Sequence, residues 1–124
     1  MPSPSGLRQL PALRVPALPD NDVHAAYKCY VFVRPQCLKP DWSRDRILNE
    51  IIARGVPAFS GSCSEVYLEK AFDNTDWRPA QRLVNARELG ETSMMFMVHP
   101  TLTDQEIALT CKVISEVVQQ ASLP

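Results

Sequence analysis

The chain has 124 residues, 45% of them hydrophobic, which is enough to form one compact domain with its own core. Its 13 basic and 14 acidic residues nearly balance, so we expect neither nucleic acid nor an anionic membrane surface as a partner. The longest apolar runs, Cys29 to Val33 and Met94 to Val98, are far shorter than the roughly 20 residues of a membrane-spanning helix. No secretion signal is recognisable, and we therefore expect a cytoplasmic protein.

The cysteines give no sign of a metal site. Four of them lie at long, irregular intervals, and none forms the C-x-x-C pair that is typical of tetrahedral zinc sites. We expect reduced thiols rather than ligands or disulfides at Cys29, Cys37, Cys63 and Cys111.

The N-terminal segment is rich in proline. Between Pro2 and Pro19 the prolines recur about every fourth residue, which argues against a helix or a central strand because each proline removes a backbone donor. Apolar residues alternate with these prolines, a pattern that fits an extended arm on an apolar surface and equally a flexible linker. We therefore assign residues 1–22 to a proline-rich arm or linker and residues 23–124 to the folded domain.

The first half of that domain reads as a strand, a helix and a second strand. Aromatic and β-branched residues predict a central strand from Tyr27 to Val33. Asp41 or Ser43 is expected to cap a helix with its apolar residues at helical spacing, and Gly55 to end that helix in a left-handed conformation. A short strand then runs from Val56 to Phe59, and a long surface loop continues to about Trp77.

Two further helices and one strand are expected in the second half. Pro79 is placed in the first turn of a helix that Gly90 ends, and a third strand spans residues 93–98. Thr103 and Glu106 have the spacing of a capping box at the start of the last helix, which carries one apolar stripe. This order predicts an α/β fold, more closely an α+β two-layer sandwich with a three- to four-stranded sheet covered by helices on one face.

These segments, in this order and spacing, resemble the C-terminal small domain of the DegT/StrS family of pyridoxal-phosphate-dependent nucleotide-sugar aminotransferases. The resemblance rests on Ala53-Arg54-Gly55-Val56, on Pro79-Ala80 and on the segment Phe96 to Thr103 around its His-Pro turn. It implies a fold-type I aminotransferase, in which a lysine of a large N-terminal domain of about 250 residues holds pyridoxal phosphate. The implied reaction is amino transfer to a keto nucleotide sugar in amino-sugar or cell-surface polysaccharide biosynthesis.

The same resemblance implies a division of labour. No set of residues in this chain reads as a pyridoxal-phosphate site, because its four lysines, Lys28, Lys39, Lys70 and Lys112, are each as well explained by surface solvation. We therefore expect no cofactor to be bound by this chain alone and pyridoxal phosphate to be bound by the complete enzyme. The implied partners are the large cofactor-binding domain of the same enzyme, a nucleotide-sugar substrate and a second copy in a homodimer.

The candidate substrate-contacting residues follow the second predicted strand. Hydroxyl groups and free backbone donors on a glycine loop could contact a sugar or a phosphate, although an ordinary turn uses the same residues for local hydrogen bonds. Relatives often carry a histidine and aromatic residues here, so their contacts do not transfer directly. The candidates are Phe59, Ser60, Gly61, Ser62, Cys63 and Tyr67, and we assign no catalytic and no metal-ligating residue.

Three functions compete at this level. The first is the small domain of a sugar aminotransferase, inactive alone because the domain with the pyridoxal lysine is missing. The second is an independent, non-catalytic α/β module that binds a metabolite or a protein. The third is a thiol enzyme using Cys63, which ranks last because no histidine is paired with it in the sequence.

Overall fold

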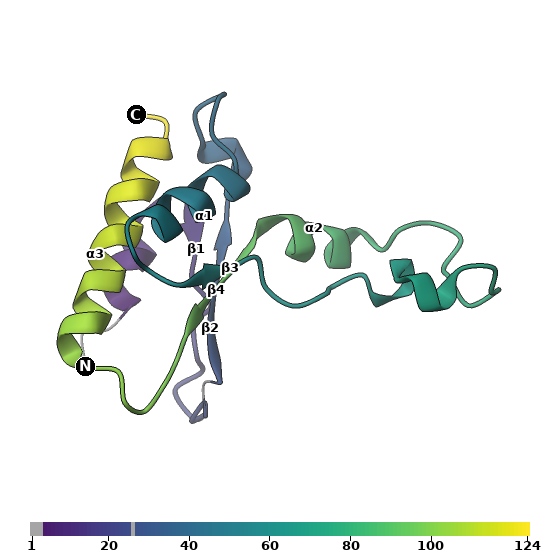
Figure 1. Ribbon diagram of the computed structural model, residues 1–124, viewed down its shortest axis with the longest axis horizontal. Helices are drawn as coiled ribbons and strands as arrows, with labels where there is room; N and C mark the ends of the chain where they lie inside the picture. Colours follow the sequence, from purple (N-terminus) through teal and green to yellow (C-terminus); the bar gives the residue numbers. More distant parts are fainter. Residues whose placement is uncertain (1–3, 26) are drawn as a thin grey trace.

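The computed structural model describes residues 4–25 and 27–124 of the chain (Figure 1). Residues 1–3 of the proline-rich segment lie outside this range. No helix in the described part is long and apolar enough to cross a membrane. The elements in chain order are η1 (Pro4–Gln9), β1 (Leu13–Arg14), β2 (Lys28–Val33), η2 (Pro35–Cys37), α1 (Arg44–Ala53), β3 (Ala58–Phe59), η3 (Val66–Leu68), η4 (Lys70–Phe72), α2 (Val84–Thr92), β4 (Ser93–Met97) and α3 (Asp104–Ala121).

The strands of the described residues form one antiparallel sheet with the order β1-β2-β4-β3. The central pair is β2 with β4, which confirms that the strand predicted at Tyr27 to Val33 is central, although it begins at Lys28. Helices α1 and α3 cover one face of this sheet (Figure 1). The predicted two-layer sandwich is therefore confirmed, with a four-stranded sheet.

The core lies between this sheet face and the two helices. It contains the inward residues of β2 and β4, such as Val31 and Phe96, and the apolar stripe of α3, in which Val117 is fully buried. The predicted capping box is present, since Thr103 Oγ1 accepts a hydrogen bond from the Glu106 amide at 3.2 Å and the Glu106 carboxylate accepts one from the Thr103 amide at 2.7 Å. Ser43 caps α1, and Gly55 follows it with a φ of 87°.

The N-terminal segment is more ordered than its prolines indicate. The expectation that no helix forms between Pro2 and Pro19 is wrong, because Pro4–Gln9 form a 3₁₀ helix. Strand β1 pairs with β2 at the edge of the sheet, where a neighbouring proline costs no ladder hydrogen bond. Leu7, Ala12 and Leu13 are buried in the core of the domain.

Helix α2 departs most from the sequence prediction. It begins at Val84 rather than near Pro79, because Leu83 before it has an extended backbone and its amide donates to the Tyr67 hydroxyl at 2.9 Å. Gly90 lies inside the helix and does not end it. A β-carbon at Gly90 would collide with the Ser64 hydroxyl, so glycine here permits a close approach between helix and loop.

Residues 60–92, which we call the arm, form the excursion between β3 and β4. The arm contains η3, η4 and α2 and projects from the sheet on the side opposite α1 and α3 (Figure 1). Its base is held by Arg44 of α1, whose Nη1 donates to the carbonyl oxygens of Gly90 at 3.0 Å and of Ser93 at 2.8 Å. A guanidinium at the C-terminal end of α2 satisfies free carbonyls and complements the helix dipole.

We predict that Ile114→Asp or Val117→Asp unfolds the domain. Both side chains are at most 2% exposed, and an unpaired buried carboxylate costs several kcal/mol, a large share of a typical stability of about 5–15 kcal/mol. Thermal melting followed by circular dichroism measures the effect. Gln119→Asp is the matched control, because it places the same charge on the exposed side of α3 and should leave the melting temperature nearly unchanged.

Candidate functional site

The loop that follows β3 is fixed against the sheet by two side-chain hydrogen bonds. The Tyr30 hydroxyl on β2 and the Ser62 hydroxyl are 2.7 Å apart, and Ser93 Oγ at the start of β4 donates to the carbonyl oxygen of Ser60 at 2.7 Å. Residues 60–62 are thus held at the point where the arm leaves the sheet. Three of the predicted site residues therefore lie together with a defined geometry.

Gly61 makes this geometry possible. Its φ is 98°, a backbone conformation that residues with a side chain rarely adopt. A β-carbon at this position would lie 2.8 Å from Ser93 Oγ and 3.2 Å from Tyr30 Cε1. The loop can therefore rest on Tyr30 and Ser93 only with glycine at position 61.

The sheet face opposite the helices is aromatic near this loop. Tyr30 and Phe32 alternate on β2 with the buried Val31, and their rings are stacked with centroids 6.4 Å apart. The Arg14 guanidinium lies 4.2 Å from the centre of the Phe32 ring, a cation–π contact. Phe59, one of the predicted site residues, ends β3 with 47% of its surface exposed. Aromatic surface is therefore available next to the hydroxyl groups of the loop.

A cavity of about 750 Å³ adjoins Tyr30 and Ser62. It lies between the N-terminal segment, the start of β2, the end of β4 and the first turns of α3. Its walls are mainly apolar, and the polar residues that line it include Arg8, His24, Lys28, His99 and Thr110. Volumes of this size accept small organic ligands, so Ser62 lies where the chain offers both polar contacts and an open hollow.

The geometry around Cys63 argues against a thiolate nucleophile. Its exposed thiol donates to Glu69 Oε1 at 3.2 Å. This hydrogen bond, followed by desolvation and the negative charge of Glu69, raises the pKa of the Cys63 thiol above its usual value. His99 Nδ1 lies instead 2.6 Å from Thr101 Oγ1. The interpretation as a thiol enzyme therefore has no support in the side chains around Cys63.

Tyr67 belongs to an ionic network inside the arm. Its hydroxyl donates to Glu65 Oε2 at 2.7 Å and accepts from the Leu83 amide at 2.9 Å. Arg82 binds the same carboxylate with two hydrogen bonds, Nε to Oε2 at 2.9 Å and Nη2 to Oε1 at 2.5 Å. The hydrogen bonds from Arg82 and then Tyr67 lower the pKa of Glu65 from its usual 4.5 to about 2.

Arg78 is the second arginine that holds the arm together. Its Nε donates to the carbonyl oxygen of Tyr67 at 2.6 Å, and Nη2 contacts the Asp73 carboxylate at 2.5 Å as well as the carbonyls of Leu68 and Glu69. The turn at the tip uses Asn74 with a φ of 59°, a conformation that asparagine tolerates. The arm thus takes its shape from directed polar contacts.

The sequence prediction did not identify Tyr30, Glu65 or Arg82 as site residues. Tyr30 could have been found from its alternation with Val31 on a strand, which places it on the opposite sheet face. Glu65 and Arg82 are 17 residues apart, and no local pattern links them. Of the predicted residues, Phe59 to Ser62 form the end of β3 and the loop after it, where Ser62 contacts Tyr30. Cys63 and Tyr67 lie further along the arm, with hydrogen bonds to Glu69 and Glu65, respectively. A role of all six in substrate binding stays a prediction.

The lysines of this chain do not fit a pyridoxal-phosphate site. A lysine that forms the internal Schiff base is held in a pocket where its amine can lose a proton. Lys39, Lys70 and Lys112 are exposed, and Lys112 Nζ lies 4.0 Å from a Glu116 carboxylate oxygen. Lys28 is partly exposed, with its ammonium 5.3 Å from the centre of the Tyr27 ring.

We predict that Gly61→Ala destabilises the domain by about 1–3 kcal/mol, because alanine is strained at this φ and its β-carbon collides with Ser93 and Tyr30. Gly6→Ala is the matched control, since nothing lies within 4 Å of a β-carbon there and its φ is not positive. Urea unfolding of both variants measures the difference. Equal midpoints for the two would show that the loop does not rest on the sheet in this way.

A second prediction concerns the charge of Glu65. Because the pKa of Glu65 is depressed in the folded arm, its ionic contacts stabilise the folded state above pH 4.5. This contribution disappears as the pH falls towards 2 and the carboxylate is protonated. Carboxyl titration by nuclear magnetic resonance should give a pKa of about 2 for Glu65 in the unmodified chain. Arg82→Gln should raise this pKa more than Tyr67→Phe does, because Arg82 is the larger cause; the reverse order would contradict the network.

Comparison with known proteins gives a strong similarity to an aminotransferase of known structure. No protein-family model and no curated protein sequence matches the chain. Among solved structures, an aminotransferase from Psychrobacter cryohalolentis is 50% identical with a TM-score of 0.88. The match covers 95% of this chain but 31% of that one, so the present chain spans about a third of the length of this relative.

Two other structures share the fold at low identity. DesV of S. venezuelae, solved with a ketimine intermediate, is 18% identical with a TM-score of 0.77, over 94% of this chain and 29% of its own. A DegT DnrJ EryC1 StrS aminotransferase from Brucella abortus is 18% identical with a TM-score of 0.71, over 91% of this chain and 27% of its own. The chain therefore shares its fold with about 30% of the length of these aminotransferases, and it is homologous to the matched part of the Psychrobacter cryohalolentis enzyme.

Proposed function

We propose that this chain acts as the C-terminal small domain of a pyridoxal-phosphate-dependent aminotransferase that transfers an amino group to a keto nucleotide sugar. The observation that carries the proposal is the 50% identity to the Psychrobacter cryohalolentis aminotransferase over 95% of this chain. At that identity, and with a TM-score of 0.88, the two domains have closely similar backbones. The reaction belongs to amino-sugar or cell-surface polysaccharide biosynthesis in the cytoplasm.

In this proposal the cofactor is held by the part of the aminotransferase that lies outside the match to this chain. The four lysines are solvated or paired, so none of them supplies the amine that binds pyridoxal phosphate. The chain contributes substrate fit instead. It carries out no amino transfer without the large domain.

The loop after β3 is the proposed substrate-contacting edge. The side chains of Phe59, Ser62 and Cys63 are exposed there, and the positive φ of Gly61 lets the loop rest on Tyr30 and Ser93. Ser62 is supported most directly, because its hydroxyl is oriented by Tyr30 and lies beside a cavity. Ser60 contributes through its carbonyl oxygen, which accepts a hydrogen bond from Ser93 and fixes the loop. Tyr67 contributes by holding the arm in shape through its hydrogen bonds with Glu65 and Leu83.

We predict that the isolated chain forms no aldimine with pyridoxal phosphate, and that amino transfer appears when the chain replaces the matching C-terminal part of the Psychrobacter cryohalolentis aminotransferase. Absorbance titration tests the first expectation. Activity of the chimera with L-glutamate and a panel of keto nucleotide sugars tests the second. Within the chimera, Ser62→Ala should lower kcat/KM for the sugar about tenfold or more while pyridoxal phosphate stays bound.

The control for this experiment is Gln119→Asp in the same chimera, because Gln119 is exposed on α3 away from the loop. A saturable aldimine band in the isolated chain, lost on replacing one particular lysine, would contradict the proposed division of labour. A folded chimera with bound cofactor and no activity towards any keto sugar would refute the proposed reaction. Saturable binding of a nucleotide sugar by the isolated chain, without any activity in the chimera, would favour a stand-alone binding module.

A further inference from the structure

The arm, residues 60–92, has an ordered shape without a core of its own. No residue between Ser60 and Glu91 is buried. Large apolar side chains are nevertheless distributed along its whole length, with 41–77% of their surface exposed: Val66, Leu68, Trp77, Leu83, Val84 and Leu89. Contiguous exposed apolar surface is typical of a binding face, and on the arm Leu83, Val84 and Leu89 come together to line one hollow.

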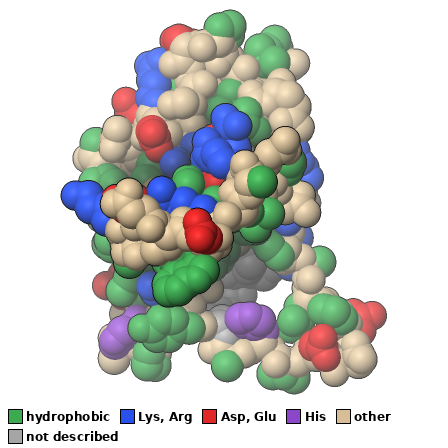
Figure 2. All heavy atoms as spheres, turned by 90° about the vertical axis from the view of Figure 1, so that its right-hand side faces the viewer, with side chains coloured by type: hydrophobic (Ala, Val, Ile, Leu, Met, Phe, Trp, Pro, Cys, Tyr) green, Lys and Arg blue, Asp and Glu red, His purple; other side chains and the backbone are tan. Residues whose placement is uncertain are grey.

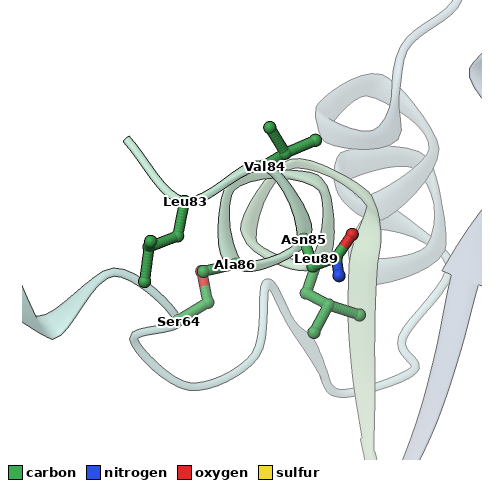
Figure 3. Close-up of a pocket in the computed structure, with 6 residues that line it drawn as sticks. All are labelled: Ser64, Leu83, Val84, Asn85, Ala86 and Leu89. Atoms are coloured by element: carbon green, nitrogen blue, oxygen red, sulfur yellow. The ribbon is translucent and has the colours of Figure 1, made fainter. Parts of the chain in front are cut away.

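The apolar residues at the base of the arm surround a hollow of about 600 Å³ (Figure 3). Ser64 lies against α2 next to Ala86, while Leu83, Val84 and Leu89 project around the helix (Figure 3). A hollow with apolar walls accepts an apolar side chain from a partner. Figure 2, which views the molecule from the tip of the arm, shows hydrophobic side chains exposed among charged ones on this side.

The arm is also held in one shape before any partner binds. Arg44 fixes its base, Ser64 packs against Gly90, and the Arg78 and Glu65–Arg82 contacts fix its outer part. A surface that is ordered in advance loses less conformational entropy on binding. The combination of exposed apolar residues and rigid support points to a preorganised docking surface.

The comparison with the Psychrobacter cryohalolentis aminotransferase indicates what covers this surface. The unmatched 5% of the present chain is far too short to contain the arm, so most of the arm follows the same path in that longer chain. There it coexists with the roughly two thirds of the polypeptide that lie outside the match. At 50% identity, a similar apolar surface is expected on the relative's arm.

We infer that the apolar surface of the arm docks onto the large, cofactor-binding portion of the aminotransferase, and that this arm is the main attachment of the small domain to it. The inference rests on the proposed function, since it takes the large domain as the partner. It adds the contacting surface, which is formed by Leu83, Val84 and Leu89 around the hollow and extends outward to Trp77.

Hydrogen–deuterium exchange of the arm amides, in the isolated chain and in the chimera with the Psychrobacter cryohalolentis enzyme, tests this inference. Amides of residues 64–84 should exchange at least about tenfold more slowly in the chimera, while those of β2 and β4 serve as an internal reference. Val84→Asp in the chimera should restore fast exchange. Aspartate is acceptable in the first turn of a helix, so this change leaves α2 intact.

The matched control is Leu109→Asp, which places the same charge at an exposed apolar residue of α3 and should leave the arm protected. Equal exchange of the arm in both proteins, or protection that survives Val84→Asp, overturns the inference. Protection that rises with concentration in the isolated chain, together with a dimer, assigns the surface to a second copy instead.

If the chimera does not fold, exchange in the intact Psychrobacter cryohalolentis aminotransferase decides the question, because its segment aligned with residues 64–84 must then be protected. Amino transfer is measured separately. An arm that is protected in an inactive chimera refutes the proposed reaction and leaves the docking surface standing. An active chimera with an unprotected arm refutes the docking surface alone.

Discussion

The pairing of β2 with β4 is the contact on which the rest of this structure depends. It joins residues 28–33 to residues 93–97, so α1, β3 and the whole arm are an excursion between two neighbouring strands. On one face the pair supplies Val31 and Phe96 to the core. On the other face Tyr30 and Ser93 hold the loop after β3. One strand pair thus builds the core and positions the candidate site.

Elements with a strong local pattern could be predicted from the sequence, whereas those that depend on distant contacts could not. The strand ending at Val33 and the helix capped by Thr103 have their signals within a few neighbouring residues. The start of α2 depends instead on the hydrogen bond from the Leu83 amide to the Tyr67 hydroxyl. The helix continues through Gly90, where the absence of a side chain leaves room for Ser64. The ordered N-terminal segment depends on pairing with β2, including the bond from the Arg34 amide to the Ala12 carbonyl at 2.7 Å.

The candidate site was predictable only in part, for the same reason. Glycine and serine after a strand mark a loop with free polar groups, and this local signal located Ser60 to Ser62. Their orientation comes from Tyr30, 32 residues from Ser62. The family resemblance supplied an expectation that no local pattern could give, namely that the lysine chemistry belongs to another domain.

The way the arm is stabilised connects domain docking to the candidate site. Guanidinium groups hold its shape through backbone carbonyls and carboxylates, leaving its apolar side chains free for a partner. Ser64 links α2 directly to the loop of Ser60 to Ser62, because it follows that loop in sequence and packs against Gly90. A partner that immobilises α2 therefore also limits the movement of this loop. The proposed docking surface and the proposed substrate-contacting loop are therefore linked through two close approaches, one at Gly61 against the sheet and one at Gly90 against Ser64.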